Sequence, residues 1–241
     1  HRISIKKLII RFHIYEAAYN RHKKNLGGIR MTRLCRSRYT CCKCGAEDTY
    51  EVILATDQRG KPDLDFRPPE SYRSTMEQWL QRCEACGYVN SCVARENGVP
   101  EDFVFSDVAY HELLRREDLP PVVHRFLLYA AEMEYLQNWY ECLQAYLRAA
   151  WYYDDLGEEG KTESLRMRNK ALDALEEIPP EDPRAERIRL LRLDLLRRVR
   201  LFSQAIAECK KLQTDRNEQT AKIATYQLKL CVRYDDKAHS Q

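Results

Sequence analysis

Two copies of the motif Cys-x-x-Cys-Gly, at residues 41–45 and 83–87, constrain the fold of this chain more than any other feature of its sequence. Two residues between the cysteines let the backbone turn so that both sulfurs reach one ion, and the glycine allows the positive φ that completes the turn. Two such knuckles supply four soft ligands in a tetrahedron, which suits Zn²⁺. The motif therefore predicts one structural zinc ion per chain, with no position left for a substrate and with these ligands: Cys41, Cys44, Cys83 and Cys86.

More than one choice of ligands is open at the first knuckle, because seven of the ten cysteines lie within residues 35–92. Only Cys41 with Cys44 reproduces the spacing and the trailing glycine of the second copy, so Cys42 is predicted to be a spectator, and Cys35 and Cys92 stay open as substitutes. The knuckles are separated by more than the usual spacing of about 15–20 residues. We interpret the polar, Gly- and Pro-containing residues 57–69 as an insertion at the far tip of the ribbon. A disulfide or redox pair and an iron–sulfur site are the alternatives.

The remaining pattern predicts a mostly helical chain. Residues 49–55 are β-branched and aromatic and predict a strand, and a short strand is favoured directly before Cys83. Period-3.6 patterns then predict six helices, whose short links make neighbours antiparallel, at residues 120–137, 138–156, 162–178, 183–201, 202–213 and 216–236. The fold class is α+β, mostly α: a small β zinc ribbon over 31–100 with an inserted loop, followed by a helical domain over 101–241.

The helices carry a weak internal repeat. Residues 135–143 align loosely with residues 198–206, an offset of 63 that is near twice a 30-odd-residue hairpin period. The pattern resembles degenerate tetratricopeptide (TPR) hairpins, and a generic helical bundle is the alternative.

Charge is concentrated at the start of the chain, where residues 1–30 carry eight Lys and Arg residues against Glu16 alone. Because this segment does not begin with Met and Met31 stands shortly before the first knuckle, we interpret residues 1–30 as a basic extension that is not native to the fold. A basic amphipathic arm for an anionic surface is the alternative. No run of 18 apolar residues occurs, so no membrane span is predicted.

Four stretches together resemble a known protein family. They are the first knuckle, DLDFRPPE (63–70), RSTMEQWLQRCEACGYV (73–89) and AAWYYDDLG (149–157). Over residues 38–236 the chain resembles an uncharacterised bacterial family with a double-CxxCG zinc ribbon followed by TPR-like helices. The resemblance implies a cytoplasmic zinc-binding protein and adds no reaction. The more usual form of the knuckle is C-P-x-C-G. Here Cys42 and Glu84 replace the proline after the first cysteine of each knuckle, and neither change removes a ligand.

The inserted loop contains a candidate site formed by Asp63, Asp65 and Arg67. Paired carboxylates need a shielded pocket to act as acid and base, and a polar loop tip seldom supplies one, so we expect a solvated or ribbon-anchoring loop. No Walker A, GxSxG, HExxH or dinucleotide-binding fingerprint is present, and no catalytic residue is predicted.

The predicted function is a non-enzymatic zinc-binding protein whose helical array binds another protein. Arg189, Arg192 and Arg197 are the candidate partner-binding residues, expected on an exposed face within reach of an acidic ligand. The alternative is a nucleic-acid-associated zinc ribbon that uses the basic residues around the first knuckle, which are Arg33, Arg36, Arg38 and Lys43. An enzyme of unknown class is third.

Overall fold

Two antiparallel hairpins carry the two knuckles. The computed structural model describes residues 32–240, so the predictions for residues 1–30 lie outside the described part of the chain. The first hairpin consists of β1 (Arg33–Thr40) and β2 (Glu47–Ala55), and the second of β3 (Gln81–Arg82) and β4 (Val89–Asn90). The strand over 49–55 and the short strand before Cys83 are confirmed. Strand β1 was missed, because its exposed positions alternate with only half-buried ones and supply no clear apolar face.

A short helix α2 (Glu70–Arg73) and a 3₁₀ turn η1 (Met76–Gln78) lie between the two hairpins. The other helices follow the second hairpin. All six predicted helices are present, as α5 to α10. In chain order the helices are α3 (Glu101–Ser106), α4 (Val108–Leu114), α5 (Pro121–Tyr135), α6 (Trp139–Asp154), α7 (Lys161–Glu176), α8 (Ala185–Arg198), α9 (Phe202–Leu212) and α10 (Glu218–Val232), with η2 (Gly157–Gly160) before α7. Asn138 and Asn217 cap α6 and α10 by accepting hydrogen bonds from backbone N–H groups of the first turn.

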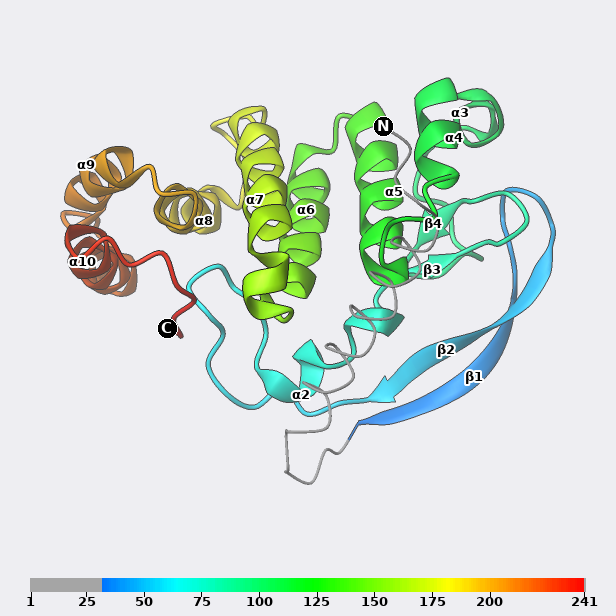
Figure 1. Ribbon diagram of the computed structural model, residues 1–241, viewed down its shortest axis with the longest axis horizontal. Helices are drawn as coiled ribbons and strands as arrows, with labels where there is room; N and C mark the ends of the chain where they lie inside the picture. Colours follow the sequence, from blue (N-terminus) through cyan, green and yellow to red (C-terminus); the bar gives the residue numbers. More distant parts are fainter. Residues whose placement is uncertain (1–31, 241) are drawn as a thin grey trace.

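The helices form two groups that differ in direction. Helices α5, α6 and α7 stand side by side, whereas α8, α9 and α10 are seen nearly end-on in the same view (Figure 1). The first core contains both knuckles and α3 to α7, and the second lies among α8, α9 and α10. Helix α8 joins them, because Leu191 and Leu195 belong to the first core and Leu190, Leu193 and Leu196 to the second. The predicted α+β, mostly α fold is confirmed, and one core spans both sides of the expected boundary at residue 100.

The inserted loop does not lie at a far tip of the ribbon, as the sequence suggested. It runs from β2 back along the helices towards the C-terminal end of the chain (Figure 1). Leu64 is 1% exposed and packs in the second core, and its N–H donates a hydrogen bond to the carbonyl of His239 at 2.8 Å. Asp63 and Ser240 form an isolated antiparallel bridge. The apolar side chains of the loop draw it onto the helices, since their burial removes apolar surface from water.

Over residues 32–240, no helix combines the length and the apolar composition that a membrane-spanning segment requires.

Candidate metal centre

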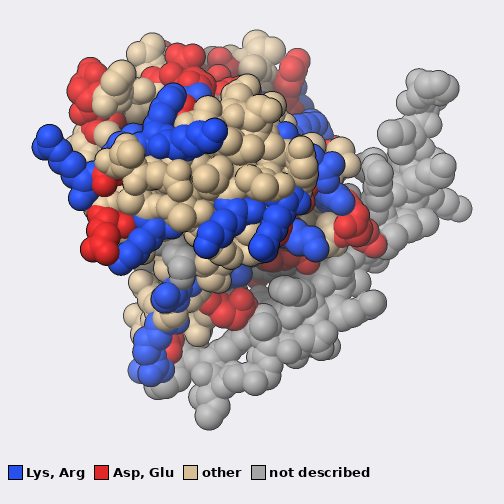
Figure 2. All heavy atoms as spheres, turned by 90° about the vertical axis from the view of Figure 1, so that its left-hand side faces the viewer, with Lys and Arg blue, Asp and Glu red and all other residues tan. Residues whose placement is uncertain are grey.

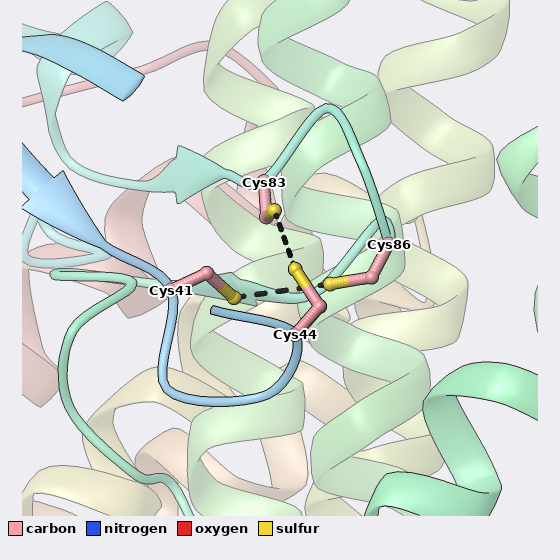
Figure 3. Close-up of side chains that lie close together, drawn as sticks. All are labelled: Cys41, Cys44, Cys83 and Cys86. Atoms are coloured by element: carbon pink, nitrogen blue, oxygen red, sulfur yellow. Dashed lines mark hydrogen bonds between the residues drawn. The ribbon is translucent and has the colours of Figure 1, made fainter. Parts of the chain in front are cut away.

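The four predicted ligands converge from the two hairpins on one point. Their sulfur atoms all lie within 4.8 Å of one another (Figure 3). The Sγ atoms of Cys41 and Cys86 are 3.8 Å apart, and those of Cys44 and Cys83 are 3.5 Å apart. A tetrahedral ion with metal–sulfur bonds of about 2.3 Å requires sulfur–sulfur edges of about 3.8 Å. The donor set therefore fits one tetrahedrally coordinated metal ion.

The two knuckles have the same backbone conformation, a tight turn closed by a hydrogen bond from the glycine to the first cysteine. The N–H of Gly45 donates to the carbonyl of Cys41 at 3.0 Å, and the N–H of Gly87 donates to the carbonyl of Cys83 at 2.8 Å. The two glycines have φ values of 71° and 85°, in the left-handed region that side chains disfavour. The sequence argument for the trailing glycine is confirmed at both copies.

Burial favours the neutral thiol at Cys41 and Cys86 unless a cation is present, whereas at Cys44 hydrogen bonds from the Ala46 backbone and the neighbouring cysteines outweigh burial and lower the pKa. Three of the four cysteines are buried and Cys44 is exposed. Burial raises the pKa of the Cys41 thiol to about 11, although backbone N–H groups of Cys44 and Lys43 that point at the sulfur act against the shift. Burial also raises the pKa of Cys86. A metal ion would supply the positive charge that holds these sulfurs as thiolates, so metal binding and proton release are coupled.

The neighbouring cysteines stand apart from this cluster. Cys42 belongs to the first knuckle by sequence, but its sulfur is outside the group of four, and its N–H donates to the carbonyl of Val93 at 2.9 Å. Cys35 and Cys92 are also outside the group. The four clustered sulfurs are those of the predicted register, with Cys42 outside the cluster.

A buried carboxylate fixes the second knuckle to the helices. Glu132 of α5 is fully buried and accepts hydrogen bonds from the N–H of Val89 at 2.9 Å, from the hydroxyl of Tyr110 at 2.7 Å and from the amide of Asn97 at 2.6 Å. Burial raises its pKa to about 7, against these three hydrogen bonds, which lower it. The Tyr110 hydroxyl also lies 2.9 Å from the carbonyl of Gly87. Sequence reasoning missed this residue, although a glutamate inside the apolar pattern of α5 was a visible signal.

The candidate residues of the inserted loop are buried, so the expectation of a solvated loop is wrong. Asp63, Asp65 and Arg67 are 7%, 4% and 5% exposed. Asp63 forms an ion pair with Arg73 at 2.7 Å, and Arg67 forms one with Asp155 at the end of α6. Burial of Leu64 carries these charged neighbours inward, where they meet charges of opposite sign.

Two of these loop residues belong to a buried ion-pair network that the sequence did not reveal. The network consists of Asp65, Arg67, Asp154, Asp155, Arg168 and Arg198. Asp154 lies 2.6 Å from Arg168 and 3.0 Å from Arg198, and Asp65 accepts a hydrogen bond from the indole N–H of Trp151 at 2.7 Å. Burial alone would raise the pKa of Asp154, but the two guanidinium groups hold it well below its usual range. Three carboxylates face three guanidinium groups, so the network is balanced within the protein.

The candidate partner-binding arginines do not form one exposed face. Arg197 is completely buried, which contradicts the prediction, because Asp194 and the C-terminal segment surround it. Its guanidinium donates to Asp194 at 2.6 Å and to the carbonyls of Asp235 and Lys237 at 2.7 and 2.8 Å. Arg189 and Arg192 reach the surface but pair with carboxylates, Asp215 at 2.7 Å and Glu176 at 2.9 Å. Basic side chains are scattered over the α8–α10 end of the molecule rather than gathered in one patch (Figure 2).

The basic group around the first knuckle is also smaller than its sequence suggests. Lys43 is buried, with its ammonium group bonded to Glu96 and to the carbonyl of Val99. Arg38 pairs across the hairpin with Glu47. Lys43 is therefore not available for contact with phosphate, which contradicts its place in the nucleic-acid alternative.

No family model, curated protein or solved structure matches this chain. The resemblance to the bacterial zinc-ribbon family consequently stays a prediction from its motifs.

Proposed function

We propose that this chain is a non-enzymatic zinc-binding protein, in which one structural Zn²⁺ holds the two hairpins and the helices serve as a protein-interaction scaffold. The observation that carries the proposal is the convergence of four sulfurs from two hairpins, at the edge of the first core, to which Cys41, Cys83 and Cys86 belong. Zinc suits a tetrahedral set of four thiolates, and a set of four protein ligands leaves no position for a substrate. The centre would therefore stabilise the fold and perform no reaction.

The scaffold role is supported by the arrangement of the helices. Each consecutive pair from α5 to α10 is in contact, so apolar side chains are buried between neighbouring helices, which TPR-like arrays also do. The charged groups that most resembled a catalytic site, Asp63, Asp65 and Arg67, are committed to ion pairs and core contacts. A cytoplasmic location is part of the proposal, since none of the ten cysteines, all of which lie within the described residues, forms a disulfide, as is usual in reducing compartments.

Metal analysis of the purified chain, expressed without added zinc, tests the proposal. We expect one Zn²⁺ per chain, lost in Cys41→Ser and retained in Cys42→Ser. The second variant is the matched control, because it changes the adjacent cysteine of the same turn. Retention of the metal by Cys41→Ser, loss of the metal from Cys42→Ser, or iron in place of zinc would contradict it.

A further inference from the structure

Two adjoining cavities form a groove across α4, α5, α6 and α7. The larger has a volume of about 510 Å³ and the smaller about 260 Å³. Both are lined by Glu134, Tyr146 and Lys170, so they are parts of one depression. The larger volume is within the range of about 300–1,000 Å³ that is typical of ligand sites.

The lining combines an apolar bed with charges that differ between the two ends. Tyr110, Leu127 and Met167 line the larger cavity. Its charged residues are three basic ones (Arg116, Arg166 and Lys170) and two acidic ones (Asp107 and Glu134). The smaller cavity is lined by Trp139, by one basic residue (Lys170) and by three acidic ones (Glu134, Asp173 and Glu177). Basic residues therefore outnumber acidic ones at one end of the groove, and the reverse holds at the other end.

Helix α7 and its C-cap residue supply much of the charge that lines the groove, and the order of these charges does not stabilise the helix. Arg166 and Lys170 precede Asp173 and Glu177 along the helix, and the last turn holds no basic residue. The helix dipole favours basic residues near the C-terminus and disfavours acidic ones there. The acidic end of the groove thus works against the stability of α7. The basic side chains are also accessible. Arg166 pairs with Glu163 and Arg116 pairs with Asp118, but all four side chains are partly exposed, so water screens both pairs.

The wall of the groove formed by α4 is held in a fixed position. Tyr110 reaches from α4 to Glu132 and to the carbonyl of Gly87. Leu114 of the same helix lies so close to Gly87 that a Cβ atom built there would stand 2.7 Å from Leu114 Cδ2. The second knuckle therefore seats α4, and a preformed groove loses little entropy when a ligand binds.

We propose that this groove binds an extended peptide segment of a partner protein, in which an apolar side chain stands between an acidic residue and a basic residue. The proposal rests on the scaffold role proposed above and assigns its binding site. The acidic residue would meet Arg166 and Lys170, the apolar side chain would enter the larger cavity, and the basic residue would meet Asp173 and Glu177. This site differs from the α8 surface that the sequence suggested.

Selection from a random heptapeptide display library on the full, metal-loaded chain tests the proposal. We expect enrichment of peptides with an aromatic or branched apolar residue flanked by opposite charges. Synthetic copies should bind the double variant Arg166→Glu/Lys170→Glu at least about tenfold more weakly, since two favourable charge contacts become repulsive. Reselection on that variant should replace the acidic residue with a basic one.

Two further variants separate the groove from the rest of the surface. Ala109→Trp places a large side chain at the exposed rim of the larger cavity and should abolish binding with unchanged helicity. Lys210→Glu on α9 is the matched charge control and should have no effect. Peptides that bind all four proteins equally would overturn the groove assignment but keep the scaffold role. A library that yields no enriched peptide would overturn both.

Discussion

The molecule buries two clusters of polar groups, and they are neutralised in opposite ways. In the proposed metal centre all four ligands are cysteines, which would repel one another as thiolates, so a cation from outside the chain would balance them. In the ion-pair network Asp65 and Asp154 face Arg168 and Arg198, so the protein supplies both signs of charge. The first cluster depends on metal supply and the second on the protonation of carboxylates.

The two clusters also connect different parts of the fold. The metal centre ties the two hairpins to the first core, whereas the network joins the inserted loop to α6, α7 and α8. Loss of one cluster should leave the other in place, because no ligand of the metal belongs to the network. Each cluster can therefore be disrupted separately by mutation.

Removal of a metal ligand should have the largest effect. Structural zinc contributes about 10 kcal/mol or more to the folding of isolated fingers, and we expect Cys83→Ser to lose on the order of 5 kcal/mol here, since the helical core still supports the hairpins. Urea unfolding measured with and without chelator gives the free energy. Chelator should destabilise the parent chain and leave Cys83→Ser unchanged. Equal stability of parent and variant would show that the centre is not structural.

Removal of the central carboxylate of the network should come next. Asp154→Asn leaves Arg168 and Arg198 buried without their shared partner, which typically costs about 3–5 kcal/mol. Asp118→Asn is the matched control, because the Arg116–Asp118 pair is largely exposed and such pairs contribute about 0–1 kcal/mol. Both variants should keep one metal ion per chain. Metal loss from Asp154→Asn would show that the two clusters are not independent.

The sequence predicted the metal centre well and the network not at all, for a physical reason. Metal ligands three residues apart form a local motif, so the chain displays it twice in its primary structure. Arg67 and Asp155 are 88 residues apart, and only the folded loop brings them together. The prediction that Arg197 is exposed was wrong for the same reason. A helical arginine is normally exposed, but the carbonyl groups that Arg197 binds, those of Asp235 and Lys237, lie 38 and 40 residues further along the chain. Helix positions were predictable because apolar periodicity is also local.

The contributions of Glu132 and Asp154 to stability should depend on pH in opposite directions. Its pKa is raised from 4.5 to about 7, so the folded state binds the proton more tightly than the unfolded state. Its contribution to stability is complete below 4.5 and is lost as the pH rises through about 7. Asp154 behaves in the reverse sense, because its lowered pKa contributes stability that is lost as the pH falls.

Stability curves of the parent chain and Glu132→Gln measure this contribution. Between pH 4.5 and 7 the free-energy difference should move in favour of the variant by about 3 kcal/mol. The metal centre is common to both proteins, so its own acid response cancels in the difference. Glu134→Gln, an exposed neighbour on the same helix, is the control and should show no such change. A difference that stays constant over this range would contradict the raised pKa.

The smallest effect should distinguish the two knuckles from each other. Alanine at Gly45 or Gly87 is strained by the positive φ, at about 1–2 kcal/mol. At Gly45 nothing lies within 4 Å of the added Cβ, whereas at Gly87 it meets Leu114. Overpacking usually costs about 1–3 kcal/mol, and we expect about 1 kcal/mol here, because the far end of a leucine side chain can shift. Gly87→Ala should therefore be less stable than Gly45→Ala and, because Leu114 belongs to α4, should alone weaken peptide binding in the groove. Equal effects of the two substitutions on binding would show that the second knuckle does not position α4.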